Sequence, residues 1–382
     1  MRSFQETLRK FGRARVRPLA AAAESAGQAP EEILRELNRL GFSRCQFPEA
    51  YAGLSRPEEC LSAAVAAAFE IAKGCAGIAL AAPGPGPLAS ILLAAGTEEQ
   101  KQAILPRFAG EEPVFAGFSL GQGLFPPDFS RVEIEAWPER AGYILQGRQS
   151  WVLNFDRAER LLIPARIGAG HSGGLGWFLL EKDAPGLKVK GRIPTLGLAA
   201  ASLGEIELAE CRVPAAARIG RQGAEAELEA GLIRTGLVFA GMAAGIIAAS
   251  LEYCLAYAED RVQFGAPIVE REAIALMLAE MKGDLRQGLS LLWRAVEEIE
   301  TDPAPLSGPA SSAMEAGVLA MAHLGPAGVR HATNAVQILG GYGYIRDYPC
   351  EKWLRDAKSL EVLMGGAERQ KLWVVELWRR AK

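Results

Sequence analysis

Hydrophobic and polar positions divide this chain into three stretches with different periods. Up to about residue 112, apolar residues recur at helical spacing, as in EEILRELNRLGF (31–42). From about 113 to 220 the pattern changes to short alternating or β-rich segments separated by glycine, proline and aspartate. Long helical patterns then return. This order predicts three domains: an N-terminal α-helical domain (1–112), a middle β domain (113–220) and a C-terminal α-helical bundle domain (221–382).

Local signals refine these elements. Gly41 is a stop for the helix before it, and the threonine of GTEEQKQAILPRF (96–108) is a cap for the helix that follows. The segment APGPGP (82–87) is expected to be a loop. In the middle domain we expect a compact sandwich or barrel. Its strands are VFAGFSL, VEIEAW, YILQGRQSWVLNF, RLLIPARI, GWFLLEK, LKVKGR and LGEIELAECRVP.

The last third predicts one long helix over Glu229–Gln263 and a second over Glu270 to about Glu300, with a break at 301–309. The first of these helices carries four glycines. An isolated glycine costs about 1 kcal/mol inside a helix, so four together predict close helix packing or a backbone approached by a ligand. These glycines are Gly231, Gly236, Gly241 and Gly245.

Composition places the chain among soluble globular proteins. Hydrophobic residues make up 49% and charged residues 23% of 382 residues, with a net charge of −3, so neither nucleic acid nor anionic lipid is an expected partner. The apolar run Thr235–Ser250 is shorter than the roughly 20 residues of a membrane span, and we interpret it as a buried helix. Six scattered cysteines without a CxxC pair predict no metal site and a reduced, cytoplasmic location.

Two motifs combine glycine, aromatic and charged residues in a fixed order. YAEDRVQFGAPI (257–268) ends a helix, and AVQILGGYGYIRDYPCEKWLRDAK (335–358) contains a glycine pair followed by a charged segment. Residues 334–370 also contain a second pair, Gly365-Gly366. Backbone that a ligand can approach closely at two places predicts a site for a large phosphorylated molecule.

These motifs resemble the acyl-CoA dehydrogenase family of flavoproteins, and LRELNRLGFSRCQFPEAYAGLS and GTEEQKQAILPRFAGEE resemble its N-terminal segments. The resemblance implies an α+β, mostly α fold: a helical domain, a central β-barrel or sandwich domain and a four-helix-bundle-like domain. It implies FAD as cofactor and an acyl-CoA or acyl-carrier-protein thioester as substrate. It also implies an electron-transferring flavoprotein as a partner and a dimer or tetramer as the assembly, and a version of that assembly with a second paralogous chain stays open.

The resemblance also assigns residues to the flavin, which in this family lies partly across a subunit interface. Arg261 would bind the pyrophosphate, and Phe264 would pack beside the adenine. The structural alternatives are a helix C-terminal arginine, a glycine C-cap and a core tryptophan. The full set of expected cofactor-binding residues is Ser119, Trp151, Arg261, Gln263, Phe264, Gln337, Gly340 and Gly341.

The chain departs from the family pattern where the chemistry is done. The family removes the α-proton of the thioester with a carboxylate, but its usual position is Met364 here, and the alternative position on the glycine-rich helix is Thr235. The flavin loop keeps Ser119 and continues as residues 120–123 without the family's acidic and Gly-Ser-Asp parts. Leu153 replaces a threonine that hydrogen-bonds the flavin.

Replacement bases are few. Glu361 and Glu368 flank Met364 and are weak candidates, and the glutamates at 225, 227 and 229 are weaker. His323 and His331 fall on predicted helices and are interpreted as structural, and His171 lies in a glycine loop.

We therefore expect a FAD-dependent oxidoreductase acting on the CH–CH group of an acyl thioester, with an atypical or missing base. Two alternatives stay open: a non-catalytic subunit of a heteromeric acyl-CoA dehydrogenase, and a binding protein that only retains the fold.

Overall fold

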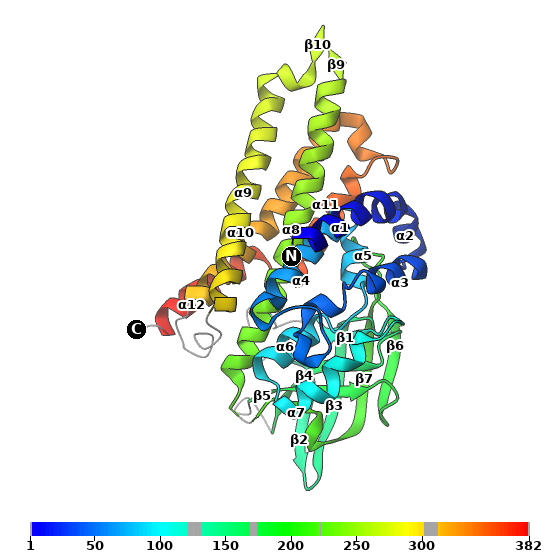
Figure 1. Cartoon of the computed structure of the whole chain (residues 1–382), viewed down its shortest axis with the longest axis vertical. Coiled ribbons are helices and arrows are strands. Elements are labelled where there is room, and N and C mark those ends of the chain that lie inside the picture. Colours follow the sequence, from blue (N-terminus) through cyan, green and yellow to red (C-terminus); the bar gives the residue numbers. More distant parts are fainter. Residues whose placement is uncertain are drawn as a thin grey trace.

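The computed structural model describes residues 2–120, 125, 131–168, 174–221, 223–301 and 312–380. The N-terminal third is helical, as predicted, and the last third is a bundle of long helices (Figure 1). The α-helices are α1 (Arg2–Phe11), α2 (Ala20–Ala26), α3 (Glu31–Arg39), α4 (Cys60–Ala72), α5 (Ala76–Ala81), α6 (Pro87–Ala95), α7 (Glu98–Ile104), α8 (Glu225–Asp260), α9 (Glu272–Thr301), α10 (Ser312–Leu339), α11 (Cys350–Leu363) and α12 (Ala367–Arg380).

Predicted boundaries hold to within a few residues. Thr97 caps α7 through a capping box with Gln100, and Gly41 ends the segment after α3 with a φ of 89°. The predicted loop at 82–87 ends one residue early, because Pro87 opens α6. The long helix α8 ends at Asp260, before the predicted Gln263, because the chain turns into a short hairpin there.

The middle of the chain forms an eight-stranded sheet that closes on itself. Strands β1 and β2 each pair with both β3 and β4, so these four strands form a closed circuit, which is the predicted barrel. The other four strands extend it at both ends. The strands are β1 (Ala116–Ser119), β2 (Glu135–Glu139), β3 (Gly142–Leu153), β4 (Arg160–Ile167), β5 (Leu175–Glu181), β6 (Leu187–Arg192), β7 (Leu203–Pro214) and β8 (Arg218–Ile219).

Alternation along the strands gives the sheet two apolar faces. On β4, Leu161 and Ile163 belong to a core inside the β domain, whereas Leu162 belongs to the large core shared with the helices. Trp177 also faces the helices and stacks on Phe118, with ring centroids 5.2 Å apart. One face of the sheet therefore forms the core of the β domain, and the other face packs against the helical domains.

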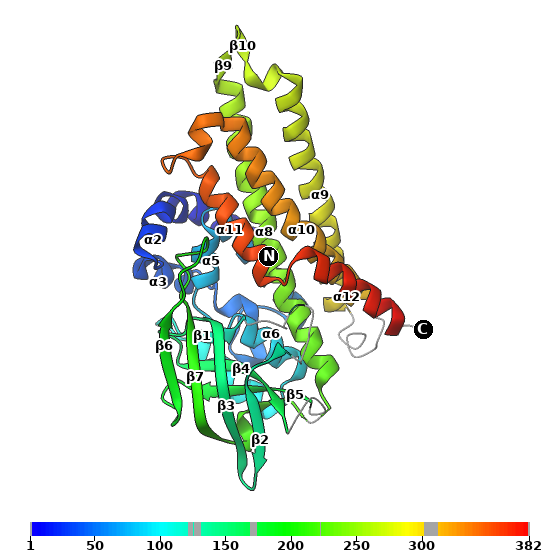
Figure 2. The same cartoon turned by 180° about the vertical axis from the view of Figure 1, so that it is seen from behind.

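The C-terminal helices form the long axis of the molecule. Helices α8, α9 and α10 run side by side to a tip made by the hairpin of β9 (Val262–Gln263) and β10 (Ala266–Pro267), and the sheet lies at the opposite end (Figures 1 and 2). Helix α8 is long and apolar enough to cross a membrane, but it is buried in this fold as a core helix.

The glycines of α8 are explained by close helix packing. A Cβ added at Gly231 would lie 2.8 Å from the side chain of Ile91 on α6, and one at Gly245 would lie 2.6 Å from the carbonyl oxygen of Phe69 on α4. Gly236 faces Met321 on α10 in the same way. The absent side chains let three neighbouring helices approach the α8 backbone.

A buried carboxylate on helix α11 joins the helical bundle to the β domain. Asp356 is 1% exposed; its Oδ1 accepts the backbone N–H of Leu198 at 2.6 Å, and its Oδ2 accepts a hydrogen bond from the buried ammonium of Lys352. Leu198 lies in the loop between β6 and β7, so this carboxylate fastens the β domain to the helical bundle.

Arg355 extends this connection to the N-terminal domain. Its guanidinium donates to Glu24 at the end of α2, to Glu351 one turn earlier and to the carbonyl oxygen of Leu196 at 3.0 Å. Gly197 has no room for a side chain, because an added Cβ would lie 2.2 Å from the Arg355 backbone. The charged segment of the C-terminal motif thus fixes the positions of the three domains relative to one another.

Replacing Asp356 should destabilise the whole fold. Asp356→Ala leaves the Lys352 ammonium buried without its partner and the Leu198 N–H without an acceptor, so we expect a loss of about 3–5 kcal/mol in the free energy of unfolding. Glu368→Ala on α12 is the control: its ion pair with Lys371 is exposed, and such pairs contribute about 0–1 kcal/mol. Urea denaturation of both variants measures the difference, and equal losses would contradict the role of Asp356.

Candidate functional site

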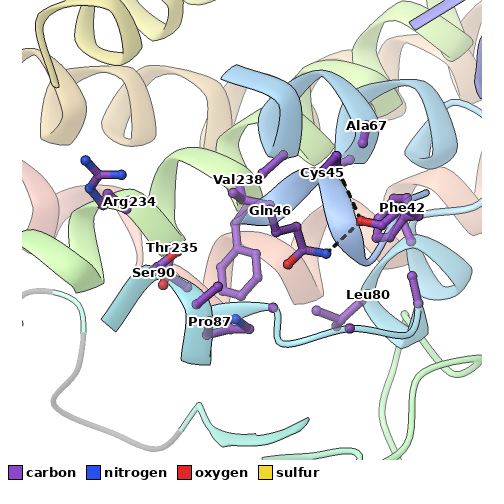
Figure 3. Close-up of a pocket in the computed structure, with 18 of the residues that line it drawn as sticks. Phe42, Cys45, Gln46, Ala67, Leu80, Pro87, Ser90, Arg234, Thr235 and Val238 are labelled. Carbon is purple, nitrogen blue, oxygen red and sulfur yellow. Dashed lines mark hydrogen bonds between the residues drawn. The ribbon is translucent and has the colours of Figure 1, made fainter. Parts of the chain in front are cut away.

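A narrow cavity lies where the three domains meet. Helices α4, α5 and α6, with the segment 42–46, supply much of its wall, α8 lines the side facing the bundle, and residues at the start of β1 and the end of β3 line the side facing the sheet (Figure 3). Its volume is about 70 Å³, and most of its lining is apolar. The position and lining fit a small, extended, largely apolar ligand.

One of the two positions at which the family resemblance leads us to expect a catalytic base lies in the cavity. Thr235 lines it, is buried, and donates its hydroxyl hydrogen to the carbonyl oxygen of Gly231 at 3.0 Å. Met364 is not among the lining residues. Its fully buried side chain faces α10, where a Cβ added at Gly325 would lie 3.2 Å from the Met364 methyl carbon.

Phe125 lies against the neighbours of both base positions. A Cβ added at Gly365 would lie 1.7 Å from its carbonyl oxygen, and one at Gly236 would lie 3.3 Å from its ring. The ring is buried and lies 6.4 Å from the ring of Phe239, which lines the cavity. The rest of the predicted flavin loop, residues 121–124 and 126–130, is outside the described residues, as is His171.

No carboxylate or imidazole belongs to the described lining of the cavity. Glu361 pairs with Lys358 at 2.7 Å, and Glu368 projects into solvent, where it pairs with Lys371. Glu229 accepts a hydrogen bond from the Trp373 indole at 3.0 Å and links α8 to α12. The weak candidates therefore have other contacts and do not reach the cavity in this conformation.

Two cysteine thiols line the cavity, and both remain protonated at neutral pH. Cys60 donates to the carbonyl oxygen of Arg56, and burial raises the pKa of the Cys60 thiol to about 12. Burial also raises the pKa of Cys45, which donates to Phe42. Neither thiol forms an appreciable amount of thiolate at neutral pH.

The predicted structural role of His331 fits its surroundings on α10. The ring is fully buried, and its Nε2 lies 2.8 Å from Asp284 Oδ2 on α9. Burial lowers the pKa of His331 although Asp284 opposes this shift. His323 contacts the carbonyl oxygen of the same aspartate, so both histidines link α9 to α10.

Two buried polar atoms at the cavity lack partners. The Oδ1 of Asn154, just after β3, accepts no hydrogen bond, and the Nε of Arg234 on α8 donates none. Both residues line the cavity, Asn154 from the sheet and Arg234 from the bundle. Buried polar groups without partners are uncommon, and at a cavity they indicate places where a ligand is bound.

A second concave surface lies at the tip of the bundle and combines the predicted dinucleotide residues of the C-terminal domain. It is a groove of about 560 Å³. Gly340 and Gly341 face open space where a side chain would otherwise stand, so their backbone is accessible. The groove is lined by Tyr257, Arg261, Gln263, Phe264, Ile268, Arg271, Ile274, Gln337, Ile338, Leu339, Gly340, Gly341, Tyr342 and Ile345.

The hairpin at this tip presents an aromatic ring to solvent. Phe264 and Gly265 form a two-residue turn with φ values of 54° and 82°, the positive values of a type I′ turn. Arg271 holds the turn by donating to the carbonyl oxygens of Gln263 and Phe264. A left-handed phenylalanine costs roughly 1–2 kcal/mol, and its side chain is 92% exposed, so the fold bears strain to display this ring.

Arg261 beside the hairpin is an available cation. Its guanidinium lies over the ring of Tyr342, 5.8 Å from the centroid, and forms no ion pair with the described residues. An arginine, an exposed aromatic ring and two bare glycines form a surface that fits a pyrophosphate and an adenine. The groove therefore fits the dinucleotide part of FAD.

The remaining predicted flavin residues lie on the sheet. Trp151 sits at a bulge of β3 with a φ of 60°, which turns it out of the regular alternation, and its carbonyl oxygen accepts the N–H of Leu120. Ser119 is buried at the end of β1, and Leu153 lines the cavity. No residue of the eight-stranded sheet belongs to the described lining of the groove at the tip, so the two sets of predicted flavin residues lie at separate places in one chain.

Sequence reasoning missed two residues of the cavity lining, Asn154 and Arg234, and Phe125, which lies next to the lining residue Phe239. Their side chains become distinctive only when distant elements such as α8 and β3 meet. A charged residue directly before the apolar run Thr235–Ser250 is the signal that was visible for Arg234.

Comparisons with known proteins agree with the fold and its motifs. Residues 1–112 match the family model described as acyl-CoA dehydrogenase, N-terminal domain, and residues 222–376 match the one described as acyl-CoA dehydrogenase, C-terminal domain. The Bacillus subtilis (strain 168) protein named Probable acyl-CoA dehydrogenase YngJ is 30% identical over 382 residues, covering 96% of this chain and 95% of that protein.

Solved structures are similar over nearly the whole chain. Butyryl-CoA dehydrogenase from Megasphaera elsdenii has a TM-score of 0.87 and 26% identity, covering 98% of this chain and 96% of that one. PigA, solved with FAD and proline, also has a TM-score of 0.87, at 21% identity, covering 100% of this chain and 98% of that one; at this identity the likeness concerns the fold.

The groove at the tip can be tested through Arg261. Arg261→Ala removes one charge-assisted hydrogen bond, typically 1.5–3 kcal/mol, so we expect FAD to bind roughly 10–100-fold more weakly. Arg286→Ala, exposed on α9 away from the groove lining, is the control and should leave the affinity unchanged. Titration of the apoprotein with FAD by fluorescence measures both, and equal affinities for the two variants would exclude Arg261 from the site.

Proposed function

Because this chain belongs to the acyl-CoA dehydrogenase family, we propose that it binds FAD and an acyl thioester as the non-catalytic chain of a two-chain oxidoreductase. The observation that carries this proposal is the chemistry of the cavity: its described lining has no group that accepts a proton at neutral pH. Removing the α-proton of a thioester requires such a group within hydrogen-bond reach. A second family chain with its own base would carry out this step in its own cavity.

The thioester would enter the cavity between α4–α6 and α8. The apolar wall suits an acyl chain, and Thr235 marks the place where some family members carry their base. The Thr235 hydroxyl proton is already donated to Gly231, and a threonine hydroxyl is too weak a base for this step. An acyl-CoA and an acyl-carrier-protein thioester present the same acyl end to this cavity.

Homologues in this family bind FAD. When bound, FAD supplies the acceptor for the β-hydrogen of the thioester, which leaves as hydride. The residues of this chain hold the cofactor from two sides: Trp151 and Ser119 from the sheet, and Arg261 with Gly340 and Gly341 from the groove. Since these two sets lie apart in one chain, each cofactor would be shared between two subunits.

This division gives the non-catalytic chain a purpose. Its groove, with the exposed Phe264, would complete the dinucleotide site of a catalytic partner, which itself carries the base. An electron-transferring flavoprotein would be the electron acceptor of this assembly. All six cysteines are free and buried, in keeping with a reduced, cytoplasmic location.

A second candidate is a flavoenzyme that acts alone with an atypical base. The cavity itself favours it, because a chain without a substrate would have little reason to keep an open space lined by unpaired polar atoms. This candidate needs a proton acceptor outside the described lining.

Introducing a carboxylate at position 235 or at position 364 tests which of the two expected base positions reaches the bound thioester. Thr235→Glu places a carboxylate in the cavity as a proton acceptor, so we expect thioester-dependent flavin reduction at least about 10²-fold faster than wild type. Met364→Glu should give a smaller gain, because residue 364 faces α10.

Thr235→Gln is the matched control, equal in size to glutamate but unable to accept the proton, and it should remain as slow as wild type. Stopped-flow absorbance of the FAD-loaded proteins without oxygen measures all four rates. A wild type as fast as Thr235→Glu would overturn the non-catalytic role and favour the second candidate.

A further inference from the structure

Arg234 is the one charged residue in the described lining of a mostly apolar cavity. It extends from α8 next to Thr235, and Figure 3 shows it at one end of the lining, with Phe42 and Leu80 toward the other. The neighbouring wall at this end comes from Cys60 and Leu61 at the start of α4. The cavity therefore ends in a guanidinium.

This guanidinium has no hydrogen-bond or ion-pair partner among the described residues. Its Nε is completely buried without an acceptor. Burial lowers the pKa of Arg234, and the carboxylate of Glu300 opposes that shift from a distance. Arginine remains charged even so, since its pKa lies far above neutrality.

Glu300 is engaged elsewhere. Its Oε1 accepts the backbone N–H groups of Leu61 and Ser62, each at 2.8 Å, and so caps the first turn of α4. It forms no ion pair with Arg234 within 4.0 Å. The negative charge of Glu300 therefore compensates the arginine only partly, and the guanidinium donates no hydrogen bond to the described residues.

An unpaired buried charge is unfavourable, and an apolar residue of similar size would avoid this cost. The cost is recovered when an anion enters and accepts the free hydrogen bonds. A guanidinium matches a carboxylate best, because its parallel N–H groups fit the two oxygens.

We infer that this cavity selects acyl thioesters whose far end carries a carboxylate, with Arg234 binding that carboxylate. The inference rests on the proposed function, since it requires that the cavity receive the acyl chain. It narrows the substrate class to monothioesters of dicarboxylic acids.

The test compares two ligands of equal chain length on the FAD-loaded protein. Hexanoyl-CoA and adipyl-CoA both have six-carbon acyl groups, and only adipyl-CoA ends in a carboxylate. Wild type should bind adipyl-CoA at least 10-fold more tightly than hexanoyl-CoA, measured by calorimetry.

Three variants test whether the charge of Arg234 causes the preference for adipyl-CoA. Arg234→Met keeps the volume without the charge and should remove or reverse the preference; Arg234→Lys should keep part of it; Arg286→Met, on the surface of α9, should behave as wild type. Thermal unfolding of each variant shows that it is folded, and Arg234→Met should not be less stable than wild type.

The failures are distinguishable. Equal binding of the two thioesters by wild type, or a preference that survives in Arg234→Met, would overturn this inference and leave the proposed function standing. Binding of neither thioester by folded, FAD-loaded wild type would overturn the proposed function and the inference together.

Discussion

The carboxylate of Asp356 holds this protein in the arrangement on which its sites depend. It joins the helical bundle to the β domain through Leu198, and the adjacent Arg355 joins both to the N-terminal helices through Glu24. The cavity lies at the junction of these same three parts, so its shape depends on their register. A shift of the sheet relative to α8 would separate Asn154 from Arg234 and open the space between them.

The contacts of Asp356 and Arg355 give residues 334–370 a different role from the one that their sequence predicted. Their sequence predicted two ligand-approach points joined by a charged helix. The first point fits: Gly340 and Gly341 expose backbone at the groove. At the second point the two glycines differ: Gly365 admits the carbonyl of Phe125, a contact within the protein, whereas Gly366 faces open space. The charged helix between them serves the fold, so these residues can keep the family's architecture while position 364 loses the family's chemistry.

Much of the fold was predictable because its signals are local. The strands follow from alternation, α7 from the Thr97 cap, and the glycines of α8 from the packing that they permit. The motif residues of the C-terminal domain were found because a hairpin and a glycine pair have sequence signatures. The direction of the Met364 side chain, the unpaired Arg234 and the separation of the groove from Trp151 were not predictable, since each depends on which distant elements meet.

The central claim is that no residue of this chain removes the α-proton of a thioester bound in the cavity. Deuterium exchange at the α-carbon tests this most directly, because it reports proton removal whether or not electrons reach the flavin. The FAD-loaded protein would be incubated in D₂O with a thioester shown to occupy the cavity, and the thioester analysed by mass spectrometry. The account predicts exchange no faster than in the absence of protein. Exchange at an enzymatic rate in the wild type would contradict it.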